Sequence, residues 1–323
     1  MGRRGWEAAE RLLDTAEAEA RFAFAGGRAE ARSLSRACVA GEAVEVSRGY
    51  YARASYFEAL PQRARAMHLI RAMARKHPEW VFASFSAALV HGLQVTNRLT
   101  GIVHLAMGAR ENRSIRDARI KCHLIRDDSY ELVSGIRVTP LRATVLDCLC
   151  RANFPQGLAI ADSALHWNLI DEDDLRRYVE HAGYRRRGIR MARKVLRWAD
   201  GRSENGGESM ARAIMIDLGF VPPDLQVEIC DPMNPTRSWR VDFHWMLPDG
   251  GVVVGELDGK GKYMQGAAHD AAPAIAKLTR ERVRESHINL TGATVLRFSF
   301  AEAMDGEYMR RLLEKAGVPM RRR

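Results

Sequence analysis

The spacing of apolar and polar residues predicts two helices and a hairpin at the start of the chain. Residues 7–24 are rich in Ala, Glu and Arg with helical spacing, and a second helical pattern covers residues 29–40. Residues 43–53 alternate like a short hairpin whose turn contains Arg48. Two helices followed by a hairpin is the order of a winged helix, which binds nucleic acid, although many interaction modules share it.

The middle of the chain, residues 61–200, has a mainly helical pattern. One helix is expected at 61–76, and a buried helix at 81–93 has Ser84 or Ser86 placed to cap its N-terminus. From residue 141 to residue 200 the pattern is again helical. Between these helical parts, strands are expected at 102–107, 118–125 and 136–140.

A polar, glycine-rich segment, Asp200–Gly207, predicts a linker to the last part of the chain. Beyond it the pattern predicts helix 208–218, strands 225–230, 238–246 and 251–258, helix 273–289, strand 293–300 and helix 301–316. The predicted fold class is therefore α+β. We expect a winged-helix-like domain at 1–60, a basic, mainly helical domain at 61–200 and a smaller α/β unit at 201–323.

The charge is unevenly distributed along the 323 residues. The chain has 50 Lys and Arg against 40 Asp and Glu, a formal net charge of +10, which favours a polyanionic partner such as nucleic acid. Residues 1–60 and 201–323 are each neutral, so the whole surplus lies in 61–200, which hold 24 basic and 14 acidic residues. The middle part is thus the expected electrostatic contact surface.

Other features of the sequence favour a protein of the cytoplasm. No stretch has the length and apolarity of a membrane span, and the N-terminus has no signal-peptide core. The five cysteines are scattered and form neither a disulfide framework nor a paired zinc motif. We expect a cytoplasmic protein that binds DNA and no membrane.

Most of the positive surplus lies at residues 175–197, which hold nine basic residues and one acid. On a helix, four of the arginines share an arc of about 60° opposite apolar residues: Arg186, Arg190, Arg193 and Arg197. Such a stripe is a solvated face over a packed one, a surface that follows phosphates, or both. The candidate nucleic-acid-binding residues are Arg185, Arg186, Arg187, Arg190, Arg193, Lys194 and Arg197.

A predicted hairpin in the last part brings acidic residues together. If the hairpin is centred on Asp249, Asp242 lies directly opposite Glu256, and strand alternation puts Asp258 on the same face as Glu256. Buried carboxylates require a countercharge, and Mg²⁺ (or Mn²⁺) binds carboxylate oxygens while leaving positions for phosphate. The alternative is a solvated hairpin end with cross-strand pairs between acids and Lys260.

The residues 203–300 resemble the PD-(D/E)xK nuclease-like domain related to very-short-patch-repair endonucleases. The resemblance rests on ESMARAIMIDLGF, WRVDFHW, VVVGELDGKGKY and RESHINLTGATVLRF in this order. It implies an α/β/α core in which Asp242 and Glu256 hold the metal, Asp258 is a further ligand, and Glu208 is a helix-borne acid. A metal-dependent endonuclease that hydrolyses phosphodiester bonds is the activity it implies.

The sequence departs from the family pattern at the lysine. Asp258 stands where the strict motif has its lysine, so Lys260 or Lys262 would have to stabilise the transition-state charge. Arg284, Glu285 and Arg297 match family positions, but from the residues alone a salt-bridged helix face and a strand-end charge are the preferred explanation. The glutamate Glu208 is also explained by the favourable position of an acid at a helix N-terminus.

The first 200 residues resemble AbiEi-type antitoxins, which have an N-terminal winged helix. The resemblance rests on FSAALVHGLQV, VTPLRATVLDCL and LAIADSALHWNLI. It implies a two-part actinobacterial protein in which residues 1–60 bind DNA. The alternative function is a non-catalytic regulator or antitoxin whose nuclease fold serves binding or dimerisation, and a homodimer or a cognate toxin is then the partner.

Overall fold

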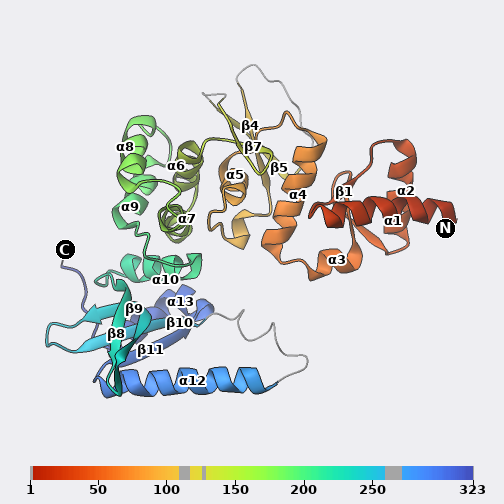
Figure 1. Cartoon of the computed structure of the whole chain (residues 1–323). Helices are drawn as coiled ribbons and strands as arrows, with labels where there is room; N and C mark the ends of the chain where they lie inside the picture. Colours follow the sequence, from red (N-terminus) through yellow and green to blue (C-terminus); the bar gives the residue numbers. More distant parts are fainter. Residues whose placement is uncertain (1–2, 109–116, 126–128, 259–270, 323) are drawn as a thin grey trace. The chain divides into compact units, whose positions relative to one another are not determined.

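The computed structural model describes residues 3–108, 117–125, 129–258 and 271–322. It divides into two compact units, Met1–Cys148 and Leu149–Arg323 (Figure 1). Both contain helices and strands, which confirms the predicted α+β class. Within the described ranges, no helix combines the length and apolarity needed to cross a membrane. The division into three domains stays a prediction.

The first unit begins with helices that pack beside a three-stranded sheet of order β1-β3-β2. Leu13 of the first helix and Leu34 of the second lie in one buried cluster. The hairpin β2–β3 is confirmed, with Arg48 and Gly49 in its turn. The elements are α1 (Arg3–Ala18), β1 (Ala23–Phe24), α2 (Arg28–Val39), β2 (Ala43–Ser47) and β3 (Tyr50–Arg53).

The first helix ends earlier than its sequence pattern predicts. Ala20 has a left-handed backbone with φ of 48°, and the chain then turns so that Ala23 and Phe24 pair with β3. Phe22, next to this strand, is buried and donates its backbone N–H to the carbonyl of His68. Pairing with a distant strand therefore overrides the local helical pattern.

The rest of the first unit combines helices with two small sheets. Strands β4 and β5 pair in parallel, and β6 and β7 pair antiparallel. The elements are α3 (Ala54–Ala59), α4 (Gln62–Lys76), α5 (Ser84–Val90), the short 3₁₀ helix η1 (Asn97–Leu99), β4 (Val103–Met107), β5 (Ile120–Leu124), β6 (Glu131–Val133) and β7 (Ile136–Val138).

The predicted serine cap of α5 is wrong. Ala83 precedes the helix and makes no side-chain cap, and Ser84 is its first residue, with φ of 51°. The Ser86 hydroxyl instead accepts the backbone N–H of His104 in β4 at 2.9 Å. The Ser86 hydroxyl therefore binds the neighbouring strand β4 instead of the end of the helix.

The second unit contains a helical half and a sheet-containing half. The helix α6 (Leu141–Arg151) crosses from the first unit into it, and the other helices of this half are α7 (Phe154–His166), α8 (Glu172–Ala182) and α9 (Ile189–Trp198). Asn153 and Gln156 form a capping box at α7, and Asp171 caps α8 by accepting the N–H of Asp174. Three further acids, Glu172, Asp173 and Asp174, lie in the first turn of α8, where their negative charge is favourable.

The sheet-containing half is a four-stranded sheet of order β11-β10-β9-β8. Only the β10–β11 pair is parallel. The predicted order of elements is confirmed, except that Asp305 caps a new helix and divides the last one. The elements are α10 (Gly206–Asp217), β8 (Asp224–Asp231), β9 (Asn234–Met246), β10 (Val252–Asp258), α12 (Ala271–Leu290), β11 (Thr294–Ser299), α13 (Phe300–Met304) and α14 (Gly306–Lys315).

Helices cover both faces of this sheet (Figure 1). On one face, Phe243 and Phe298 pack with Met215 of α10 and Leu313 of α14. On the other face, Val241 and Val254 pack with Ile288 of α12. The sheet is therefore the middle of three layers, and side chains at its strand ends can be reached from helices on either side.

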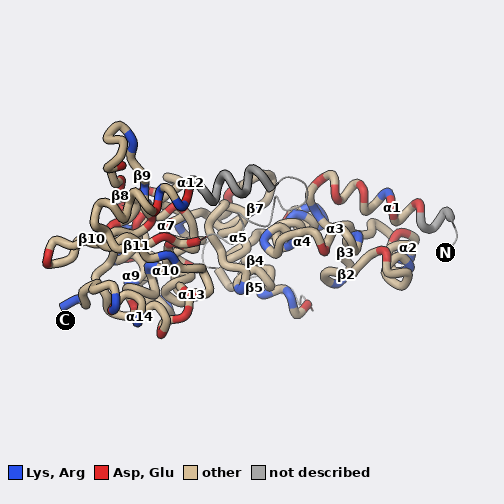
Figure 2. Tube along the Cα trace, turned by 90° about the horizontal axis from the view of Figure 1, so that it is seen from below, with Lys and Arg blue, Asp and Glu red and all other residues tan. Residues whose placement is uncertain are grey.

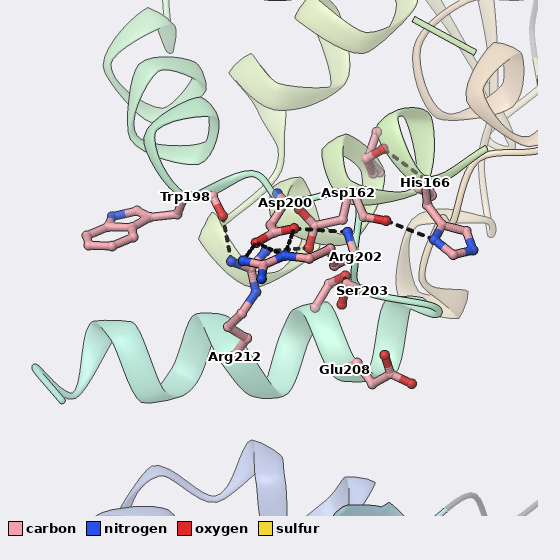
Figure 3. Close-up of polar contacts among 12 residues, drawn as sticks. Asp162, His166, Trp198, Asp200, Arg202, Ser203, Glu208 and Arg212 are labelled. Carbon is pink, nitrogen blue, oxygen red and sulfur yellow. Dashed lines mark hydrogen bonds and ion pairs between the residues drawn. The ribbon is translucent and has the colours of Figure 1, made fainter. Parts of the chain in front are cut away.

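The segment Asp200–Gly207, expected as a linker, lies inside the second unit and is held by buried polar groups (Figure 3). Asp162 of α7 accepts the N–H of Asp200 at 2.8 Å and an Arg212 N–H at 2.7 Å. Arg212 also donates to the Trp198 carbonyl at 2.7 Å. This network fixes α10 to the helical half, although burial raises the pKa of Asp162 to about 6.

Candidate functional site

The β9–β10 hairpin brings two carboxylates side by side. Its register, with Gly255 opposite Phe243, is the one that a hairpin centred on Asp249 predicts. The next pair in this register is Asp242 and Glu256, and the backbone ladder ends just before it. The two acids therefore lie where β9 and β10 begin to separate.

Two details of the backbone keep the strands in this arrangement. The Asp242 carboxylate accepts the N–H of Leu257 at 2.9 Å. The side chain thereby satisfies a backbone donor just beyond the end of the β9–β10 ladder. At Gly255, a Cβ atom would lie 3.2 Å from the Phe243 Cβ and 3.3 Å from the Trp245 ring. Glycine thus permits the close approach of the strands next to the acids.

A third carboxylate, Glu208, comes from the first turn of α10. Asn205 caps this helix, and the buried Glu208 carboxylate accepts the N–H of Glu204 at 2.8 Å and the side-chain amide of Gln226 at 3.1 Å. Burial, followed by the negative charge of Asp242, raises the pKa of Glu208 to about 7. Gln226, which donates to Glu208, lies opposite Asp242 in the β8–β9 register, so β8 connects the two acids.

Glu256 experiences the same charge from the other side. Burial raises the pKa of Glu256, with a further increase from Asp242 and an opposing decrease from Arg284. The Arg284 guanidinium of α12 forms an ion pair with Glu256, at 2.6 Å between Nη2 and Oε1. Asp242 thus contributes to the raised pKa of both glutamates, and we call Glu208, Asp242 and Glu256 the acidic trio.

Asp258, the predicted third metal ligand, binds an arginine. Arg297 of β11 donates to its Oδ1 at 2.7 Å and contacts Glu285 at 3.4 Å. The ion pairs of Arg284 and Arg297 confirm the salt-bridged interpretation of these arginines. Lys260 and Lys262 lie outside the described residues.

Two carboxylates of the acidic trio, Asp242 and Glu256, are oxygen donors of the kind that a hard divalent cation binds. Among the described residues, no three or more His, Cys, Asp or Glu are grouped so that they hold a metal ion. The Asp242–Glu256 pair alone is the donor set that Mg²⁺ takes when water and phosphate supply its remaining ligands. Asp242 and Glu256 are half-buried acids of like charge, and a cation bound between them would reduce their repulsion.

Gln226 is a site residue that the sequence does not reveal. Its backbone has φ of 54° in the middle of β8, and the pairs Leu225–Phe243 and Val227–Val241 place it opposite Asp242. Apolar residues at 225, 227 and 229 look like a regular strand. In the structure Leu225 packs on the α10 face and Val227 on the α12 face, so the irregularity turns the strand over at the site.

The basic helix α9 exposes the predicted arginine face in part. Arg190, Arg193 and Arg197 are exposed on it, and Ala192, Val195 and Leu196 are buried. Arg193 pairs with Glu180 at 2.6 Å and Lys194 pairs with Asp217 at 2.5 Å. These ion pairs neutralise part of the positive charge of the helix. The face is therefore less basic than the sequence suggests.

Arg186 does not share this face, contrary to our prediction. The helix begins only at Ile189, because Gly188 adopts a left-handed backbone with φ of 87°. A Cβ atom at Gly188 would lie 2.0 Å from the carbonyl oxygen of Cys150, so the turn requires glycine. Arg185 and Arg187 are exposed in the same turn.

The first unit has a second basic face, hidden by the neutral charge of residues 1–60. Arg28, Arg32 and Arg36 are exposed along α2, and Arg48 is exposed in the β2–β3 turn. None of the four forms an ion pair with any residue that the structure describes. The acids Asp14 and Glu17 of α1 pair instead with Arg53, leaving basic and acidic residues interspersed in this unit (Figure 2).

Comparison with known proteins assigns no activity. No protein-family model matches the chain. An uncharacterized protein of Mycobacterium tuberculosis, found in the strains CDC 1551 / Oshkosh and H37Rv, is 39% identical over 114 residues. The match covers 35% of this chain and 41% of each relative, so this chain spans less than half of their length.

Proposed function

We propose that the second unit is a divalent-cation-dependent phosphodiester hydrolase of the PD-(D/E)xK type. The observation that supports it is the acidic trio: the hairpin register makes Asp242 and Glu256 cross-strand neighbours at the end of the β9–β10 ladder, and α10 contributes the buried Glu208. Buried acids that oppose one another in this way are common at functional sites. The three-layer fold and the hairpin register agree with the family resemblance.

Each residue of the trio has a distinct part in this proposal. Asp242 and Glu256 hold Mg²⁺ or Mn²⁺, and the bound ion supplies positive charge that polarises the phosphodiester. Glu208, fixed by Gln226 and the Glu204 amide, would hold a water bound to the cation. Asp258 is held by Arg297, and the lysine of the family motif is expected from Lys260 or Lys262.

The substrate we propose is DNA, bound by the basic faces of α2 and α9. Exposed arginines without carboxylate partners remain available for phosphate oxygens, which they bind with a planar pair of donors. The helix–helix–hairpin order of α1, α2 and β2–β3 agrees with the winged-helix resemblance. The proposed protein therefore holds DNA through arginines and cuts it at the acidic trio.

A cleavage assay tests the hydrolase. Purified full chain is incubated with single- and double-stranded DNA and RNA in Mg²⁺, Mn²⁺ or chelator, beside Asp242→Asn and Glu256→Gln. We expect cation-dependent cleavage that both substitutions reduce by at least about a hundredfold. Glu314→Gln is the matched control, because Glu314 is exposed on α14. Equal cleavage by the wild type and both site variants on every substrate contradicts the proposal.

A second function, a non-catalytic regulator or antitoxin, is favoured by the ion pairs at the site. Arg284 and Arg297 neutralise Glu256 and Asp258 without a metal. In that case the chain binds DNA or a protein partner, and the fold of the second unit serves binding or dimerisation. DNA binding that is unchanged by chelator and by Glu256→Gln, together with no cleavage, supports the regulator over the hydrolase.

A further inference from the structure

We propose that Arg284 is an exchangeable counter-ion, which holds the position of the divalent cation at Glu256 and leaves that carboxylate when the cation binds. This inference rests on the proposed function of the acidic trio and adds a regulation of the same site. It makes the affinity for the cation depend on a residue that is itself no metal ligand.

The position of Arg284 supports the exchange. Its Nη2 atom lies 2.6 Å from Glu256 Oε1 and donates to the Arg240 carbonyl at 2.6 Å. The guanidinium thus joins β10 to β9 at the end of the ladder, beside the Asp242–Glu256 pair. The Arg284 side chain is 29% exposed and that of Glu256 13%, so the arginine is the more solvent-accessible member of the pair.

Arg284 differs in this respect from the other arginine of the site. Arg297 is held by Asp258 at 2.7 Å, by Glu285 at 3.4 Å and by Glu281 at 3.8 Å. Among the described residues, Glu256 is the acid that forms an ion pair with Arg284. Leaving its position therefore costs Arg284 one ion pair, whereas Arg297 would lose several.

The charges explain why the exchange favours the cation. The half-buried Asp242 and Glu256 are cross-strand neighbours in the hairpin register, and the guanidinium pairs with Glu256. A divalent cation carries twice the charge of a guanidinium and can be shared by both carboxylates, so it is the stronger counter-ion for this pair. The two positive groups also repel each other at short distance, so both cannot occupy the carboxylate at once.

Arg282 supplies a matched control on the same helix. It lies two residues before Arg284, is exposed, and pairs with no acid in the part of the chain that the structure describes. Arg282→Gln and Arg284→Gln remove the same charge from α12, but only the second frees Glu256. Long-range electrostatics therefore affects both variants, and the local exchange affects one.

The test is the binding of Mn²⁺ to the full chain without substrate, measured by titration calorimetry and by the electron paramagnetic resonance signal of free Mn²⁺. We expect Arg284→Gln to bind Mn²⁺ about tenfold more tightly than Arg282→Gln, which stays within about twofold of the wild type. Equal or weaker binding by Arg284→Gln, while the wild type binds and Asp242→Asn does not, overturns the exchange but keeps the cation site.

Two further outcomes are separated by the same experiment. Absence of Mn²⁺ binding at millimolar concentration in the wild type and in every variant overturns the cation site of the proposed function itself. If Arg284→Gln does not fold, as judged by circular dichroism, Arg284→Lys replaces it. A lysine keeps the positive charge on a shorter side chain, which reaches Glu256 and the Arg240 carbonyl less closely, so we expect about threefold tighter binding, and unchanged affinity overturns the exchange.

Discussion

Glu208 makes the stability of the chain depend on pH. Its pKa of about 7 in the folded chain, caused by burial and by Asp242, lies above the ordinary value of 4.5. Below pH 4.5 the Glu208 carboxyl is protonated in both the folded and the unfolded chain, so it does not lower the free energy of unfolding. As the pH rises from 4.5 to about 7, the unfolded chain gains more by ionising, so the free energy of unfolding falls by about 3 kcal/mol.

The variant Glu208→Gln should not show this fall in the free energy of unfolding. We expect its free energy of unfolding, measured by denaturant titration in chelator, to rise relative to the wild type between pH 4.5 and pH 7. The exposed Glu314→Gln should follow the wild-type curve. A constant difference between Glu208→Gln and the wild type over this range would show that the carboxylate ionises normally in the folded chain.

Gln226 permits a separate test of the strained backbone at the site. Both Gln226→Gly and Gln226→Ala remove the hydrogen bond to Glu208, but only glycine adopts φ of 54° without steric cost. We therefore expect the glycine variant to be more stable than the alanine variant by about 1 kcal/mol in denaturant unfolding. An alanine variant of equal or higher stability argues against the left-handed backbone at this position.

At the scale of elements, the buried pair of Asp162 and Arg212 fixes α10, which carries Glu208. Asp162→Asn or Arg212→Met leaves one buried polar partner unsatisfied, and we expect each to lower the free energy of unfolding by about 3 kcal/mol. The double variant should lose clearly less free energy of unfolding than the two single variants together, because both charges are then removed. Denaturant unfolding of all four chains measures this, and additive losses would show that the two groups do not interact.

The elements themselves were largely predictable, because local patterns determine them. The strands and helices after residue 207 lie within a few residues of their predicted places, and the turn at Asp249 determines which acids of the hairpin meet. The exceptions depend on distant partners: Ala23 leaves the first helix to pair with β3, and the hydroxyl of Ser86 bonds to β4 instead of capping a helix. No local pattern contains this information.

The site was predictable only in part for the same reason. Asp242 and Glu256 follow from the register, whereas Gln226 lies in a pattern that looks like an ordinary strand. The ion pairs of Arg284 and Arg297 join a helix and a strand to the hairpin, and the Asp162–Arg212 pair spans 50 residues. Contacts of this kind depend on how the layers pack and have no signal in the spacing of residue types.

At the scale of the whole molecule, exposed arginines form separate faces, one in the neutral residues 1–60 and one in residues 61–200, which hold the whole surplus of ten positive charges. Exposed arginines without ion pairs among the described residues lie on α2, at 28, 32 and 36, and on α9, at 190 and 197. Arg193 of α9 is already paired with Glu180. If DNA contacts both faces, each should contribute its own share of released counterions.

This division makes the salt dependence of DNA binding a test of both faces. With five to seven phosphates engaged, the slope of log affinity against log salt should be about −5 to −6. Arg190→Ala with Arg197→Ala should reduce its magnitude by about 2, and so should Arg28→Ala with Arg32→Ala, because each phosphate contact contributes about 1. The control Arg177→Ala, whose arginine pairs with Asp174, should change it by less than about 0.5. If only one of the two double substitutions alters the slope, DNA binding belongs to the unit that contains the substituted arginines.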